Sequence, residues 1–160
     1  MSAVMGIDPG VRGSLTILGA GGFIVHQEVF QPGMTHTALV AAIRLGLNKL
    51  HDIDGKHVFV EKVGYMPGDG GKGANTFGRV DGLIRGAVIM WQLELGHGIL
   101  LDVLPMMWQA KLGCLSGGNK NVTKARAAEL WPNVRWTHAS ADSALIAKYG
   151  QVTLAEKGWP

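Results

Sequence analysis

Asp8 ends a short apolar run at residues 3–7, and Pro9 and Gly10 turn the chain directly after it. Such a run predicts a buried strand. A carboxylate at the end of a buried strand is unfavourable unless something compensates its charge, and a divalent metal ion commonly does so. We therefore interpret Asp8 as a candidate metal ligand. The alternative is an aspartate that only caps the Pro-Gly turn.

Glu61 repeats this pattern at the end of a second apolar run, residues 57–60. The glycine-rich segment 64–73 follows and cannot continue a strand. If the two runs are parallel neighbours, Asp8 and Glu61 lie side by side at the carboxyl edge of a sheet, where ligands collect in α/β proteins. The alternative is a solvent-facing glutamate at a strand exit.

His138 and Asp142 add two more metal-ligating side chains near the end of the sequence. Residues 138–149 read as a helix that ends at a Gly150 C-cap. The i, i+4 spacing places both side chains on one helix face, and the small residues between them allow close packing on a sheet. The alternatives are a residue at the helix start for His138 and a surface acid for Asp142.

Basic residues gather in the middle of a mildly basic chain. The net charge is +3, and nine of the fifteen lysines and arginines lie between Lys62 and Arg135. Gathered around the acids, they would form a rim that attracts phosphates; the alternative is ordinary solvated helix faces. The nine are Lys62, Lys72, Arg79, Arg85, Lys111, Lys120, Lys124, Arg126 and Arg135.

Composition restricts the class of protein. We expect 160 residues to form a single domain, 1–160, with a proper core. No apolar run reaches the roughly 18 residues of a membrane span, and no signal-peptide pattern is present. The single cysteine, Cys114, excludes an intrachain disulfide and a cysteine-based zinc site, and favours an intracellular setting.

Hydrophobic periodicity predicts a three-strand meander followed by alternating helices and strands. We expect strands at 4–8, 13–18, 23–30, 58–61 and 99–104, and helices at 36–50, 75–95, 106–112, 122–130 and 138–149. This order is typical of an α/β fold with a mixed sheet and helices on both faces.

Helix 75–95 carries more apolar surface than one sheet can cover. A stripe from Phe77 to Leu95 accounts for one face, and Leu83, Ile89, Met90 and Leu93 extend beyond it. Such a helix is buried on more than one side. Its second partner is either another layer of the same chain, formed by the helices after Lys111, or another molecule.

Taken together, these segments resemble the RuvC-type Holliday junction resolvases of the ribonuclease H-like superfamily. The resemblance rests on Gly6-Ile7-Asp8-Pro9-Gly10, on the strand ending in Glu61, and on the helix with Asp142. Segments 66–68, 73–82, 108–112, 119–120 and 125–132 are similar to phage-type members. The resemblance runs from about Val4 to Gly150.

The resemblance implies a ribonuclease H-like fold with a central five-stranded mixed sheet, and an endodeoxyribonuclease that cuts branched DNA with two Mg²⁺ ions, which Mn²⁺ replaces. Asp8, on the central strand, would bridge the ions. Glu61 would serve the leaving-group side, and Asp142 the water. His138 stands where many members have an acid, so it is a candidate ligand that lowers the negative charge of the site.

The resemblance also implies DNA contacts and partners. Lys120 would stabilise the scissile phosphate, Lys111 would hold the backbone, and Tyr65 or Met66 would stack as a wedge in the junction. An equally acceptable interpretation of 64–73 is a plain surface loop. The DNA-binding candidates are Lys62, Tyr65, Met66, Lys72, Arg79, Lys111, Lys120 and Lys124.

A two-fold symmetric junction needs two symmetric cuts, so the resemblance predicts a homodimer through helix 76–95. We expect a bacterial cytoplasmic setting without membrane contact, and a phage or prophage gene.

Other classes of function fit the sequence less well than a resolvase does. A P-loop is excluded because the residue five positions before Gly71 is Met66 rather than glycine. A ribonuclease H-type nuclease of RNA:DNA hybrids is the nearest enzymatic alternative. A non-catalytic module that binds branched DNA is the other, although it would not need Glu61, His138 and Asp142 together.

Overall fold

A computed structural model describes residues 1–62 and 70–159, apart from the side chain of Lys72. Its five-stranded sheet has the order β3-β2-β1-β4-β5. The strands are β1 (Val4–Asp8), β2 (Ser14–Leu18), β3 (Ile24–Val29), β4 (His57–Glu61) and β5 (Ile99–Val103). The first three strands are antiparallel neighbours, and β4 and β5 run parallel to β1. The predicted mixed sheet is confirmed, with β1 at its centre.

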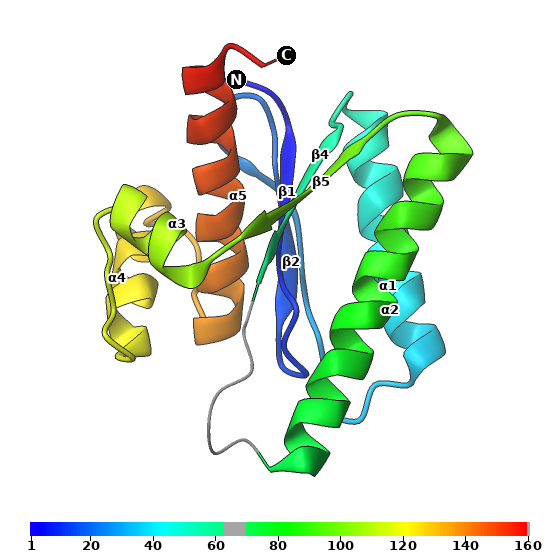
Figure 1. The fold of residues 1–160 in the computed structure, drawn as a ribbon. Coiled ribbons are helices and arrows are strands. Elements are labelled where there is room, and N and C mark those ends of the chain that lie inside the picture. Colours follow the sequence, from blue (N-terminus) through cyan, green and yellow to red (C-terminus); the bar gives the residue numbers. More distant parts are fainter. Residues whose placement is uncertain (63–69, 160) are drawn as a thin grey trace.

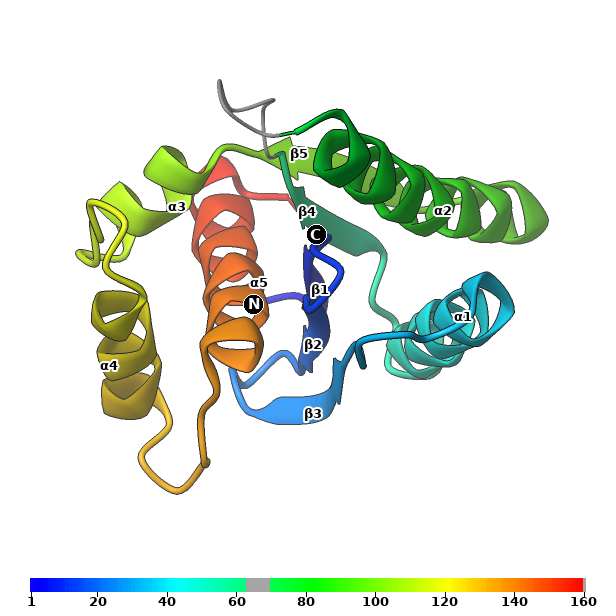
Figure 2. The ribbon, with the colours of Figure 1, turned by 90° about the horizontal axis from the view of Figure 1, so that it is seen from below.

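Helices cover both faces of the sheet (Figures 1 and 2). One face carries α1 (His36–Asp52) and α2 (Gly71–Leu95), and the other carries α5 (His138–Lys157). The short helices α3 (Pro105–Lys111) and α4 (Lys120–Leu130) lie on the α5 side of the sheet. The helices after Lys111 therefore do not form a second layer over α2, so that alternative is wrong.

Strand alternation decides which way the acidic side chains point. Met5 and Ile7 of β1 belong to the core cluster shared with α1 and α2, whereas Val4 packs in the cluster beneath α5. In β4, Phe59 likewise faces α5. Because side chains alternate along a strand, Asp8 and Glu61 project to the α5 side. Ile7 pairs with Val60, so the two acids end neighbouring strands.

Helix α5 approaches the sheet closely because two of its contact points are glycines. A Cβ on Gly6 would lie 2.3 Å from backbone atoms of Ser143 and Ala147. A Cβ on Gly150 would lie 2.6 Å from the Phe59 ring. The predicted C-cap at Gly150 is wrong: α5 continues to Lys157 and ends at Gly158, whose φ is 64°. Gly150 provides space for packing rather than a left-handed turn.

The other boundaries differ little from the predicted ones. Helix α2 begins at Gly71 rather than 75, and α4 begins at Lys120 rather than 122, with the Asn119 side chain accepting from the Asn121 N–H as its cap. Within 1–62 and 70–159, none of the helices combines the length and apolar character needed to cross a bilayer.

Candidate active site

Asp8 both caps its turn and points into the site. Its Oδ1 accepts a hydrogen bond from the Gly10 N–H at 3.2 Å, so Asp8 caps the turn in addition to lying beside the other acids. That contact engages one carboxylate oxygen. Burial raises the pKa of Asp8, and the Gly10 N–H and the charge of Lys120 oppose this shift. The carboxyl group is therefore held in a place that disfavours its charge.

Glu61 lies beside Asp8 at the end of β4. Burial, together with the negative charges of Asp8 and Asp142, raises its pKa to about 7, and the Trp108 hydrogen bond and the charge of Lys120 oppose this shift. The Trp108 Nε1–H donates to Glu61 Oε1 at 2.8 Å, and the Trp108 side chain is buried. This contact is not predictable from the sequence, because Trp108 lies 47 residues from Glu61. The available signal is that a buried indole N–H needs an acceptor.

Asp142 completes a cluster of three acidic side chains from β1, β4 and α5. Burial, together with the charge of Asp8, raises its pKa to about 6, and the Thr123 hydroxyl, Lys120 and His138 oppose this shift. Asp142 is only 8% exposed, and among the described residues its buried Oδ1 has no hydrogen-bond partner. The predicted grouping of Asp8, Glu61 and Asp142 is thus present in the structure.

A buried hydroxyl network fixes the start of α5 on the sheet. The Ser14 hydroxyl lies 2.7 Å from the Ala139 carbonyl and 2.6 Å from Ser143 Oγ, which is also 2.7 Å from Thr16 Oγ1. The Gln27 side chain joins the network through Thr16. Since Ser143 follows Asp142, these hydrogen bonds hold the Asp142 backbone next to β2.

His138 is the first residue of α5 and is exposed, directly after the Thr137 N-cap. Its charge acts on Asp142, lowering the pKa of that carboxyl. The structure therefore brings His138 within electrostatic reach of the acid cluster, while its position at the helix start also fits the alternative interpretation.

Lys120 lies at the acid cluster, as the sequence predicts. Its Nζ is 3.9 Å from Asp142 Oδ2, and its charge lowers the pKa of Asp8, Glu61 and Asp142. It opens α4 directly after a turn in which Gly117 and Gly118 both have positive φ. Lys120 is thus a cation held at the rim of the three carboxylates.

The donor chemistry of this cluster fits a divalent cation. Its carboxylates supply oxygen ligands, one buried oxygen lacks a partner, and burial raises each pKa in the absence of a compensating charge. In the part of the chain that the structure describes, however, no three His, Cys, Asp or Glu side chains are arranged as one ready ligand set.

The remaining DNA-binding candidates are spread out. Lys62 and Arg79 are exposed and Lys124 is half-buried, whereas Lys111 binds Glu156 at 2.6 Å. Glu156 lies 14 residues beyond Asp142 on α5, roughly 21 Å along the helix axis, so Lys111 is not at the acid cluster. Tyr65, Met66 and the Lys72 side chain lie outside the described residues.

Two further basic residues of the middle segment are engaged in ion pairs. Arg85 pairs with Asp81 and Asp102, and Arg126 pairs with Glu129. The Arg85 side chain is only 23% exposed and joins α2 to β5 through Asp102, so it does not fit the interpretation as a solvated helix face.

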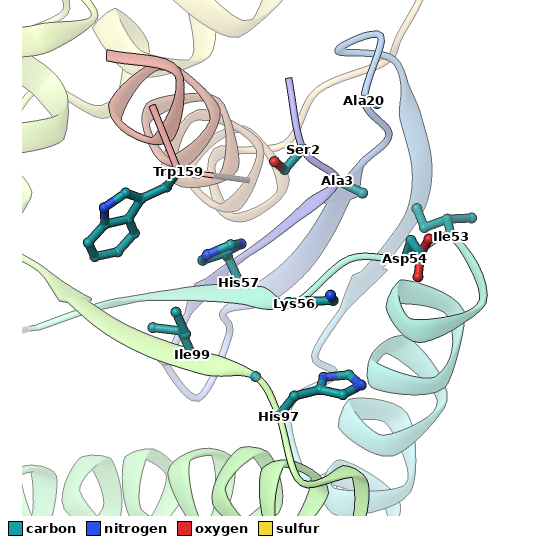
Figure 3. A pocket seen from close by; sticks show the side chains of 11 residues that line it. Ser2, Ala3, Ala20, Ile53, Asp54, Lys56, His57, His97, Ile99 and Trp159 are labelled. Carbon is teal, nitrogen blue, oxygen red and sulfur yellow. The ribbon is translucent and has the colours of Figure 1, made fainter. Parts of the chain in front are cut away.

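A large cavity of about 680 Å³ lies at the opposite end of the sheet (Figure 3). Its lining includes His57, Ile99 and Trp159. His57 begins β4, whereas Glu61 ends it. This hollow is therefore separate from the acid cluster, which we identify by its chemistry rather than by its volume.

Comparisons with known proteins bear on the fold. No family model matches the sequence, and no curated protein sequence matches it significantly. The structure of Thermus thermophilus RuvC in complex with a Holliday junction substrate is 23% identical, with a TM-score of 0.68 over 99% of this chain and 97% of that one. A second Thermus thermophilus RuvC structure is 22% identical, with a TM-score of 0.70 over 98% and 96%.

The yeast mitochondrial Holliday junction resolvase is 17% identical, with a TM-score of 0.57 over 97% of this chain and 81% of that one. At these identities the likeness concerns architecture. The chain thus has the fold of the RuvC-type resolvases, over nearly its whole length.

Proposed function

We propose that this protein is a metal-dependent endonuclease that resolves Holliday junctions and related branched DNA by hydrolysing phosphodiester bonds. The observation that carries the proposal is the grouping of Asp8, Glu61 and Asp142 at one edge of the sheet, with Lys120 beside them. The RuvC-like fold over nearly the whole chain supports it.

In this proposal Asp8, Glu61, Asp142 and His138 hold two Mg²⁺ ions, which Mn²⁺ replaces. Bound divalent ions would stabilise the attacking and leaving oxygens of the phosphodiester. The protein's own contribution is to orient the ligands: Trp108 fixes Glu61, and the Ser14–Ser143 hydrogen bond fixes the start of α5. Lys120 supplies positive charge for the phosphate.

A catalytic role fits the electrostatics better than a purely DNA-binding role. Three partly or fully buried carboxylates with raised pKa values disfavour folding at neutral pH and weaken attraction to DNA phosphates. A binding module would gain from neutral or basic residues at these positions. We retain the nuclease of RNA:DNA hybrids as the enzymatic alternative.

We also propose that the protein acts as a homodimer through the outer face of α2. Ile89, Met90 and Leu93 are exposed there, with Leu93 at 71%. Gly78 and Gly82 on the same helix leave open space, since a Cβ on either would meet nothing within 4 Å. A symmetric dimer would cover this face and present two sites to a two-fold symmetric junction.

The resemblance of several segments to phage-type members supports a bacterial cytoplasmic setting and a phage or prophage gene.

Cleavage of four labelled substrates tests the proposed activity. A four-way junction, a flap, an RNA:DNA hybrid and a linear duplex are incubated with the protein in Mg²⁺ or Mn²⁺. We expect paired, symmetric cuts in the junction, weaker cleavage of the flap and little of the duplex. Preferential cleavage of the hybrid would favour the ribonuclease H alternative, and metal-independent retardation of the junction without cleavage would favour the binding module.

A further inference from the structure

Lys120 stands out because it supplies positive charge to all three acids at once. Its Nζ lies 3.9 Å from Asp142 Oδ2. Its positive charge also lowers the pKa of Asp8 and of Glu61. The Asp142 side chain is only 12% exposed, and among the described residues its Oδ1 remains without a hydrogen bond. The cluster therefore has one nearby ammonium and spare capacity for a further cation.

We propose that the ammonium of Lys120 is the internal counter-ion of the acid cluster and competes with the divalent metal for it. The inference rests on the proposed function, because it assumes that the cluster is the metal site. In the metal-free protein Lys120 stands in for part of the missing positive charge. When metal enters, the ammonium is repelled and moves outward, toward the place where a substrate phosphate would lie.

The ion pair between Lys120 and Asp142 can be broken at little cost. At 3.9 Å it is an ion pair beyond hydrogen-bond distance, so little is lost when it breaks. The Lys120 side chain is 63% exposed, whereas Asp142 is enclosed. Lys120 begins α4 directly after the N-cap Asn119, and the turn before this cap contains Gly117 and Gly118. The lysine can therefore turn toward solvent while the carboxylates keep their places.

This competition couples metal binding to DNA binding. A phosphate that attracts Lys120 frees the carboxylates for metal, and linkage requires that metal raises the affinity for DNA by the same factor. The cluster therefore binds metal most completely when DNA is present.

Calorimetric titration of the DNA-free protein with Mn²⁺ tests the inference. The titration is run at pH 8.5, above the pKa of about 7 of Glu61 and the pKa of about 6 of Asp142, so that protons on these two carboxyls compete little with the metal. The proteins compared are the parent, Lys120→Met, Lys148→Met and Asp8→Asn. Lys148 is the matched control because it carries the same charge on α5, roughly 9 Å along the helix axis from Asp142.

We expect Lys120→Met to bind Mn²⁺ about fivefold more tightly than the parent, which corresponds to ~1 kcal/mol for a unit charge at about 4 Å in water. Lys148→Met should stay within twofold of the parent. Thermal melting provides a second measurement: Mn²⁺ should raise the melting temperature of Lys120→Met more than that of Lys148→Met.

Equal or weaker Mn²⁺ binding by Lys120→Met, with a folded protein by circular dichroism, would overturn the competition. The Asp8→Asn variant separates this failure from failure of the proposed function. If Asp8→Asn binds Mn²⁺ as tightly as the parent does, the cluster is not the metal site. If Asp8→Asn abolishes binding but Lys120→Met does not strengthen it, only the counter-ion role fails.

Discussion

Glu61 shows at the scale of one residue what the acid cluster does to the metal-free protein. Burial and the charges of Asp8 and Asp142 raise its pKa to about 7, from an ordinary value of 4.5. The folded state thus holds a proton that the unfolded chain releases. The contribution of Glu61 to stability is complete below pH 4.5 and is lost as the pH rises through about 7.

Replacement of Glu61 by Gln removes this titration. We expect the metal-free variant to equal the parent near pH 4.5 and to exceed its free energy of unfolding by up to about 3 kcal/mol at pH 8. Denaturant unfolding at several pH values, in the presence of a chelator, measures the difference. An identical pH dependence in both proteins would show that Glu61 is not desolvated as described.

Trp108 acts on the acid cluster through one hydrogen bond, which its Nε1–H donates to Glu61. Trp108→Phe keeps an aromatic ring but removes the Nε1–H donor, which leaves the Glu61 carboxylate free to rotate. We expect at least a fivefold loss of junction cleavage at limiting Mg²⁺, partly restored at high Mg²⁺, since an unfixed ligand weakens metal affinity. Cleavage rates over a Mg²⁺ series test this. A loss of cleavage that does not depend on the Mg²⁺ concentration would show that Trp108 acts only through its packing in the core.

The three acids were predictable because each ends or lies within a segment with a clear pattern. Asp8 and Glu61 each close a buried strand, and Asp142 lies among small residues at the start of a helix. The Trp108–Glu61 contact and the Lys111–Glu156 pair were not predictable. Both join distant segments whose relative positions follow only from the packed fold.

At the scale of elements, the site depends on how closely α5 packs on β1. Gly6 lies opposite the α5 backbone at Ser143 and Ala147, and no side chain fits between them. The adjoining hydroxyl network then fixes the position of α5 along the strands. The Asp142 carboxylate is therefore placed by backbone contacts of its helix.

Gly6→Ala should push α5 away from the sheet. We expect a loss of about 1–3 kcal/mol in the free energy of unfolding, because the helix backbone must move, together with reduced cleavage by the protein that remains folded. Gly73→Ala is the control, since its added Cβ meets nothing within 4 Å. Denaturant unfolding of both variants measures the effect, and equal stability of the two would contradict the close approach.

The strands and helices were predicted well, but the end of α5 was not. Glycine is a strong helix-ending signal in a sequence, so Gly150 was interpreted as a C-cap. In the structure Phe59 of β4 occupies the space beside Gly150, and the helix passes through. Local sequence does not distinguish a glycine chosen for its φ from one chosen for its missing side chain.

At the scale of the whole molecule, the outer face of α2 carries exposed apolar side chains that the described part of the chain does not cover. Ile84, Val88 and Trp91 of the apolar stripe are buried in the core of the same chain. The exposed side chains of Ile89, Met90 and Leu93 account for the apolar surplus seen in the sequence. We interpret this face as the dimer contact.

Leu93→Glu should therefore weaken dimerisation without unfolding the chain. We expect sedimentation velocity at micromolar concentration to give a dimer for the parent and a monomer for the variant. Leu45→Glu on α1 is the control, because it places the same charge on another exposed leucine. A parent that is monomeric, or a variant that stays dimeric, would contradict the proposed interface.

The central claim is that Asp8 belongs to a metal-dependent centre that cuts branched DNA, and Asp8→Asn tests it most directly. The change removes one negative charge and leaves the side-chain shape nearly intact. The measurement is junction cleavage in Mg²⁺ under single-turnover conditions, with junction affinity determined by gel retardation in parallel. We predict a rate at least about a hundredfold lower, a barrier rise of ~2.7 kcal/mol or more, with junction affinity equal or higher. Cleavage by Asp8→Asn within twofold of the parent rate would contradict the account.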